Sequence, residues 1–181
     1  MNRFMNIRIM NTERISEWPR FYTASVFEWK PLLTEDKFKE IILNSLRFLV
    51  ADNRIVLNAF VIMNTHIHLI WQAKGDYTPT DIQLSFMRYT AQQMKKELMV
   101  SDPVFLEEFK VHKGDREYQF WKREALSVEL FTPAVFYQKL EYIHNNPVRA
   151  GICNFPEEYY YSSASFYATG IDKFGMLSHY M

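Results

Sequence analysis

The sequence predicts an α+β fold in which helices pack on one face of a small antiparallel sheet. Apolar residues alternate with a period of two in some stretches and recur every three or four positions in others, which are the spacings of strands and helices. These stretches follow the order strand, helix, strand, strand, helix, strand, helix, which is typical of the α+β class. At 181 residues, with 48% hydrophobic and 23% charged side chains, the chain is expected to form one domain over 1–181.

The first half of the chain contains four predicted elements. A strand over 21–27 alternates and is rich in aromatic and β-branched residues. A helix capped by Thr34 follows, and its apolar residues recur at helical spacing through position 49. Two strands are expected over 55–63 and 66–72, and the Asn64-Thr65 step between them predicts a bulge or a tight turn.

Three further elements are predicted in the second half. A helix capped by Thr80 or Asp81 is expected to run to position 98, and a strand-like piece lies around Phe120-Trp121. Thr132-Pro133 begins the last helix, because proline suits the first helical turn. This helix should stop near position 145, since Pro147 disfavours helical geometry at the residue before it.

Composition limits where the protein works and what it binds. The single cysteine, Cys153, excludes an intrachain disulfide and a cysteine-based zinc cluster, and it favours a reducing cytoplasm. Residues 1–18 form a polar N-terminal extension without a signal-peptide block, and no window reaches the ~20 apolar residues of a membrane span. A tail over 171–181 is expected to be disordered or to fold over the functional site. The 21 basic and 21 acidic residues cancel, so any nucleic-acid site must be local.

Two histidines stand two positions apart in the apolar run from Met63 to Trp71. Residues i and i+2 of a strand point to the same face, so His66 and His68 should project side by side, with Ile67 and Leu69 facing the opposite layer. Two imidazoles held this way can chelate one metal ion. The pair could equally be two hydrogen-bonded histidines of the core.

Tyr142 and Asn146 are four positions apart at the end of the last helix and therefore share one face. A protonated phenol, with a pKa near ~10, is a poor nucleophile. A divalent cation favours the phenolate and neutralises charge on a phosphodiester under attack. The alternative is a core tyrosine followed by a simple C-cap. Combined with the histidines, the pattern indicates metal-assisted phosphoryl transfer by Tyr142, and Tyr137, with Glu141 four positions on, is the competing nucleophile.

Four motifs give the chain a family resemblance over roughly residues 20 to 168. In chain order they are VIMNTHIHLIW at 61–71, FW at 120–121, YIHNNPVRAGI at 142–152 and YYYSSA at 159–164. With these motifs the sequence resembles the REP-associated tyrosine transposases, within the superfamily of HUH single-strand DNA nucleases. The Met63-Asn64-Thr65 step differs from the Met-Pro-Asn or Met-Pro-Glu usual in that family.

The resemblance implies a ferredoxin-like HUH nuclease core and a role for each matching residue. Tyr142 matches the nucleophile that forms a covalent 5′-phosphotyrosine, and His66, His68 and Asn146 match the ligands of a divalent metal, Mg²⁺ or Mn²⁺. The implied substrate is single-stranded DNA with hairpin repeats, handled by a monomer or a homodimer.

Basic residues near these motifs are candidates for phosphate contacts. Lys122 and Arg123 follow Trp121, and Arg149 follows the tyrosine helix.

Two other functions fit parts of the pattern. One is a DNA-hairpin-binding module that no longer cleaves. The other is a small metal hydrolase or oxygenase in which an acidic residue, first of all Asp76, completes the site of His66 and His68.

Overall fold

A computed structural model of the chain describes residues 18–114 and 116–180, so the predicted extension over 1–18 lies outside it except for Trp18. The strands are β1 (Arg20–Ser25), β2 (Ile55–Ile62), β3 (His66–Ala73), β4 (Lys110–Lys113), β5 (Arg116–Tyr118) and β6 (Leu126–Glu129). The α-helices are α1 (Asp36–Ala51), α2 (Pro79–Ser101), α3 (Pro103–Glu107), α4 (Pro133–His144), α5 (Asn146–Arg149) and α6 (Ala164–Thr169). Short 3₁₀ turns lie at Phe27–Trp29, Leu32–Thr34 and Pro156–Glu158.

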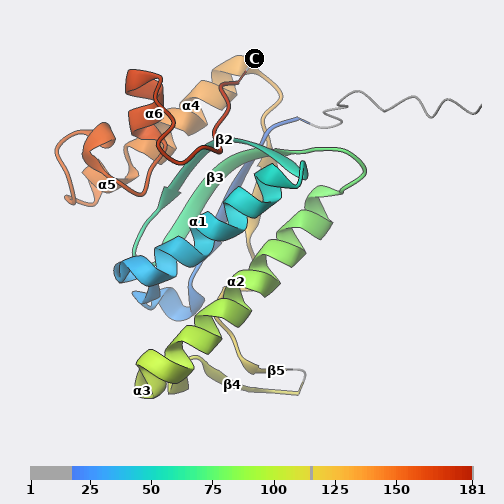
Figure 1. Ribbon diagram of the computed structural model, residues 1–181, viewed down its shortest axis with the longest axis vertical. Helices are drawn as coiled ribbons and strands as arrows, with labels where there is room; N and C mark the ends of the chain where they lie inside the picture. The colour runs from blue at the N-terminus through green and yellow to red at the C-terminus, as the bar shows by residue number, and fades with distance from the viewer. Residues whose placement is uncertain (1–17, 115, 181) are drawn as a thin grey trace, which may run out of the picture.

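The central sheet has the strand order β2-β3-β1-β6, and every neighbouring pair is antiparallel. The helices α1 and α2 connect β1 to β2 and β3 to β6, which makes two interleaved β-α-β units of the ferredoxin-like kind. Figure 1 shows α1 and α2 on one side of this sheet, with α4, α5 and α6 gathered at the other. The predicted α+β class, an antiparallel sheet with helices packed on it, is confirmed. The prediction that the helices lie on one face is wrong, because α4 covers the face opposite α1 and α2.

Two apolar clusters fill the spaces on the two sides of the sheet. The larger one joins α1 and α2 to inward residues of the sheet such as Tyr22, Phe60 and Ile67. The smaller one joins Phe136, Leu140 and Ile143 of α4 to the opposite face of the same strands. The sheet is therefore buried on both sides, with α4 as the only long helix covering the second side in the described part of the chain.

A β-bulge at Asn58 sets which residues of β2 face α4. The register of β2 against β3 shifts between Leu57 and Ala59. Leu57 faces the α1–α2 cluster, whereas Ala59 and Val61 face α4. Such an extra residue reverses the alternation of faces along a strand.

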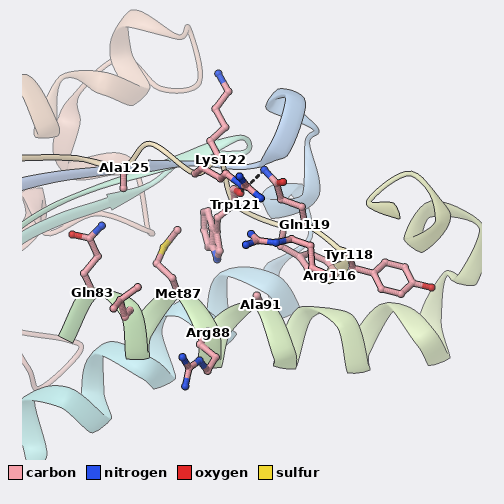
Figure 2. A pocket seen from close by; sticks show the side chains of 13 residues that line it. Gln83, Met87, Arg88, Ala91, Arg116, Tyr118, Gln119, Trp121, Lys122 and Ala125 are labelled. Carbon is pink, nitrogen blue, oxygen red and sulfur yellow. Dashed lines mark hydrogen bonds between the residues drawn. The ribbon is translucent and has the colours of Figure 1, made fainter. Parts of the chain in front are cut away.

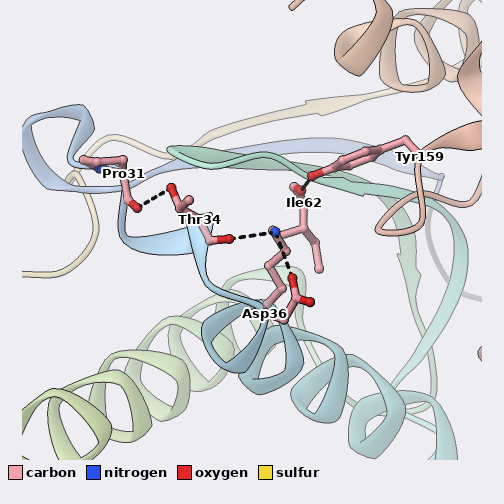
Figure 3. Close-up of polar contacts among 6 residues, drawn as sticks. Pro31, Thr34, Asp36, Ile62 and Tyr159 are labelled. Atoms are coloured by element: carbon pink, nitrogen blue, oxygen red, sulfur yellow. Dashed lines mark hydrogen bonds and ion pairs between the residues drawn. The ribbon is translucent and has the colours of Figure 1, made fainter. Parts of the chain in front are cut away.

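Two predicted helix caps are wrong. The Thr34 hydroxyl donates to the Pro31 carbonyl at 2.8 Å, so that α1 begins only at Asp36 (Figure 3). Thr78, and not Thr80 or Asp81, caps α2, because Pro79 already occupies the first turn and the Asp81 amide donates to the Thr78 hydroxyl at 3.2 Å. The predicted Thr132 cap of α4 is confirmed: its hydroxyl accepts from the Val135 amide at 3.3 Å.

The strand that completes the central sheet, β6, lies later in the chain than the strand predicted around Phe120-Trp121. Trp121 makes only a single bridge with Val26, and the regular pairing with β1 is made by Leu126–Glu129. The aromatic pair instead anchors its segment in the core. Phe120 stacks on Phe109 at 4.8 Å, and the Trp121 indole donates to the Thr90 hydroxyl at 3.0 Å.

The segment after α5 closes over the free edge of β2. Ser162 forms a bridge with Val61, the Ile62 amide donates to the Tyr161 carbonyl at 2.9 Å, and the Tyr159 hydroxyl donates to the Ile62 carbonyl at 2.8 Å (Figure 3). The short helix α6, which the sequence does not predict, follows at once.

The expectation that the C-terminal tail is disordered is wrong for residues 171–180, which pack against the rest of the protein. Phe174 and Met176 are buried, and the Ser178 amide donates to the Leu57 carbonyl at 2.9 Å. The ring of Tyr180 stacks on Phe136 at 4.2 Å. The tail therefore covers the edge of β2 near its bulge. None of the helices in the described residues has the length and apolar character needed to cross a membrane.

Candidate active site

His66 and His68 lie on β3, an inner strand that pairs with both β2 and β1. Both side chains lie on the face that α4 covers, with ring centroids 4.9 Å apart. Ile67 and Leu69 belong to the cluster on the opposite face, which confirms the predicted alternation. An inner strand fixes both imidazoles on a rigid base.

His68 is buried and has one nitrogen without a partner. Its Nδ1 lies 2.7 Å from the hydroxyl of Thr23, its register partner on β1, whereas its Nε2 is buried without a hydrogen bond to any described residue. Burial, together with the smaller effects of the charges of His66 and Lys139, lowers the pKa of His68 to about 3. The imidazole is therefore neutral at pH 7. When Nδ1–H donates to Thr23, the lone pair stands on Nε2.

His66 is linked to the far end of the chain. Its Nδ1 lies 3.1 Å from the Thr65 hydroxyl, and its Nε2 lies 3.3 Å from Oδ1 of Asn146. Burial lowers the pKa of His66, while the bond to Asn146 acts in the opposite direction. Asn146 opens α5 directly after α4, so the turn between these helices brings its amide to β3.

These residues fit a divalent cation. Two donors at 2.0–2.1 Å from an ion are separated by about 2.9 Å in octahedral geometry and about 3.4 Å in tetrahedral geometry. The separation of 3.3 Å between His66 Nε2 and Asn146 Oδ1 falls in this range. The buried, partnerless Nε2 of His68 supplies a third donor. In the described ranges no third His, Cys, Asp or Glu joins the pair, so Asp76 does not complete a site there.

Tyr142 stands beside the histidines and remains open to solvent. Its ring lies 5.2 Å from that of His68 and 5.9 Å from that of Phe21, and the residue is 37% exposed. Two cations lie against the same ring: Arg149 Cζ is 5.4 Å and Lys139 Nζ is 5.8 Å from its centroid. The arrangement places a phenol, two imidazoles and two positive charges around one small region.

The other predicted residues fall in three places. Arg149 lies against Tyr142, as described above. Lys122 Nζ lies 4.6 Å from the Trp29 ring, which in turn lies 5.9 Å from the ring of His66. Arg123 is exposed and lines a cleft beside α2, on the other side of the sheet. Lys122 and Arg149 therefore border the site, and Arg123 does not.

Tyr137, the competing nucleophile, occupies a different side of α4. The Tyr137 ring packs edge-on against Phe136. Tyr137 also lies near Tyr167 of α6, whose pKa is raised to about 12 mainly by burial and to a lesser extent by Tyr137. Five helical positions separate it from Tyr142, which is roughly 140° around the axis.

Three residues of the site were not predicted from the sequence. Lys139 precedes Tyr142 by three positions and Asn146 by seven, so helical spacing could have placed it on the same face. Thr23 contacts His68 only because of the register between β1 and β3. Trp29 has a φ of 58°, a left-handed turn conformation that carries its ring toward His66.

Comparison with known proteins supports the fold and gives no match in sequence. No protein-family model matches the chain, and no curated protein does. Among solved structures, a REP-associated tyrosine transposase bound to a REP hairpin has a TM-score of 0.61 at 16% identity, over 91% of this chain and 93% of that chain. A Deinococcus radiodurans protein provisionally described as a transposase has a TM-score of 0.47 at 19% identity, over 70% and 88%. The first match shows a shared fold and supports the resemblance drawn from the motifs at the level of structure.

Proposed function

We propose that this protein is a metal-dependent, transposase-type nuclease that cleaves and rejoins single-stranded DNA through a covalent phosphotyrosine. The observation that carries the proposal is the position of the Tyr142 ring, 5.2 Å from His68 and within reach of Arg149 and Lys139. A half-exposed phenol beside neutral imidazoles and cations suits attack on a phosphodiester. The shared fold with a REP-associated transposase adds support.

A divalent cation, Mg²⁺ or Mn²⁺, held by His66, His68 and Asn146 would neutralise charge on the scissile phosphate and favour the tyrosine phenolate. Imidazole ligands favour Mn²⁺ of the two. Thr23 and Thr65 hold the two rings through their Nδ1 atoms and leave Nε2 for the ion.

In the proposed reaction the Tyr142 oxygen attacks phosphorus as its proton passes to solvent. The bond between phosphorus and the 3′ oxygen breaks, and that oxygen leaves as a hydroxyl after taking up a proton. Lys139 and Arg149, which flank the ring, would hold the non-bridging oxygens. One phosphodiester is exchanged for another, so attack by a 3′-hydroxyl on the phosphotyrosine rejoins DNA without ATP.

The proposed partner is single-stranded DNA that carries hairpin repeats, and one copy of the chain is sufficient for the reaction. The neighbour with the same fold is bound to a REP hairpin. In this chain Tyr142 and Asn146 lie against the histidines of the same copy, which supports a site completed within one copy.

The test is cleavage of hairpin DNA with a single-stranded flank in the presence of Mn²⁺. The wild-type protein should give a DNA–protein adduct that survives denaturing electrophoresis. Tyr142→Phe should abolish the adduct and cleavage while hairpin binding persists, and Tyr137→Phe, the matched control on the same helix, should cleave normally. Normal cleavage by Tyr142→Phe would reject the proposed nucleophile, and hairpin binding without cleavage by the wild type would identify a non-cleaving binding module.

A further inference from the structure

A cleft of about 630 Å³ opens between α2 and the segment over 116–125, on the side of the sheet away from α4 (Figure 2). Its size falls within the ~300–1,000 Å³ range of sites that hold small organic ligands. The cleft is lined by three arginines, Arg88, Arg116 and Arg123, and by the backbone end of Lys122, whose ammonium lies outside it over Trp29; no described Asp or Glu lines it. In a chain of net charge zero, this is a local concentration of positive charge.

The walls of the cleft suit a flat, polar ring. Trp121 is nearly buried, and its bond to Thr90 fixes the ring as a rigid wall that points toward α2 (Figure 2). Met87 adds a thioether from α2. Gln119 also borders this space, but its side-chain amide is turned away from α2 and donates to the Trp121 carbonyl at 3.2 Å, so it helps to hold the Trp121 wall in place (Figure 2).

The cleft is connected to the histidine face around the edge of the sheet. The Lys122 amide donates to the Ser25 carbonyl at 2.8 Å, and Ser25 is the register partner of His66. Lys122 therefore lies two strand spacings from His66, roughly 10 Å. Figure 2 shows its side chain directed away from α2, opposite to Trp121, and its Nζ lies over Trp29 beside His66.

We propose that this cleft binds an unpaired base of single-stranded DNA, and that the strand then continues around the sheet edge, past Lys122 and Trp29, to the phosphate at Tyr142. The inference rests on the proposed function and adds a second contact region for the same substrate. The base lies between Trp121 and Met87, and the arginines hold the neighbouring phosphates. Single-strand sites commonly combine a cationic groove with aromatic walls in this way.

The binding test uses an unstructured, fluorescently labelled DNA of about twelve nucleotides, with every variant made on the Tyr142→Phe background so that no cleavage occurs. Arg88→Gln should weaken binding about tenfold and lower the slope of log affinity against log salt by about 0.7. Ala125→Phe, which fills the cleft without changing its charge, should weaken binding with the slope unchanged. Lys96→Gln is the matched control, because it removes an exposed charge from α2 outside the cleft.

The outcomes separate this proposal from the proposed function. If wild-type protein cleaves hairpin DNA but Arg88→Gln and Ala125→Phe bind the single strand as Lys96→Gln does, the cleft proposal is overturned and the nuclease stands. If the wild type neither cleaves nor binds, both are overturned. If free mononucleotide displaces the labelled strand as effectively as the unlabelled strand does, the cleft is a nucleotide site and not part of a DNA path.

Discussion

His144 and Ser163 share a buried hydrogen bond of 2.9 Å between Nε2 and Oγ. The same serine hydroxyl accepts from the Phe60 amide of β2 at 3.0 Å. His144 stands two positions after Tyr142, so this contact ties the last turn of α4, with Tyr142 on it, to the sheet. It also explains in physical terms why the Tyr-x-His and aromatic-Ser-Ser motifs occur together in this chain.

Replacing Ser163 with alanine should therefore destabilise the protein. Nε2 of His144 and the Phe60 amide would both lose a partner in a buried place, which costs roughly 1–3 kcal/mol. For a chain of this size the Tm should fall by about 2–4 °C for each kcal/mol, measured by thermal unfolding with circular dichroism. Ser165→Ala, on the half-buried start of α6, is the matched control and should change the Tm little. Equal shifts for both variants would show that the bond contributes nothing specific.

The same histidine predicts a pH dependence of stability. Burial lowers the pKa of His144 to about 4, from about 6.5 in the unfolded chain. Between these values the unfolded chain binds one more proton than the folded chain, so stability falls as the pH is lowered from about 6.5 to about 4. The loss is on the order of 1–3 kcal/mol. His144→Gln should flatten the Tm–pH curve in this window, and curves that stay parallel to the wild type would contradict the assignment.

The periodic parts of the fold and site could be predicted from the sequence because they depend on local geometry. Alternation along one strand was enough to place His66 and His68 together, and helical spacing relates Lys139 to Tyr142 within α4. Helical spacing alone does not account for Asn146, because α4 ends at His144 and Asn146 opens α5. By contrast, Thr23 lies 45 positions before His68, and only the pairing of β1 with β3 brings them to 2.7 Å.

The wrong elements have a common physical cause, which is that tertiary packing outweighed local preference. Phe120 and Trp121 have strong strand propensity, yet their rings are used to fill the space between the sheet and α2. The real edge strand, Leu126–Glu129, alternates exposed and half-buried residues and has none that is fully buried, so its pattern is weaker. The six-residue helix α6 is too short for its spacing to be distinctive, and it is held by burial of Phe166.

Thr23 should act on metal binding without being a ligand. Its hydroxyl, 2.7 Å from Nδ1 of His68, holds the tautomer that leaves Nε2 available, and loss of such partners typically lowers metal affinity about 10–100-fold. Thr23→Val keeps the shape and strand propensity of the residue, so a change in metal affinity in this variant can be attributed to loss of the hydroxyl. Isothermal titration with Mn²⁺ should show the loss in Thr23→Val and near-normal affinity in Thr23→Ser. Unchanged affinity in Thr23→Val would mean that His68 is oriented by its ring contacts with Phe21, His66 and Tyr142 and not by the hydroxyl.

Lys139 should have opposite effects on the metal and on the DNA. Its ammonium lies 4.9 Å from the Phe21 ring and 5.8 Å from the Tyr142 ring, and its charge helps to lower the pKa of His68. Lys139→Gln removes a charge that repels a bound cation, so Mn²⁺ affinity should rise a few-fold. It also removes a donor to the attacked phosphate, so the cleavage rate should fall roughly tenfold to a hundredfold. General damage to the fold would lower both quantities, so the opposite signs distinguish a role in phosphate binding from a structural one. Lys96→Gln, which removes a charge far from this face, should alter neither.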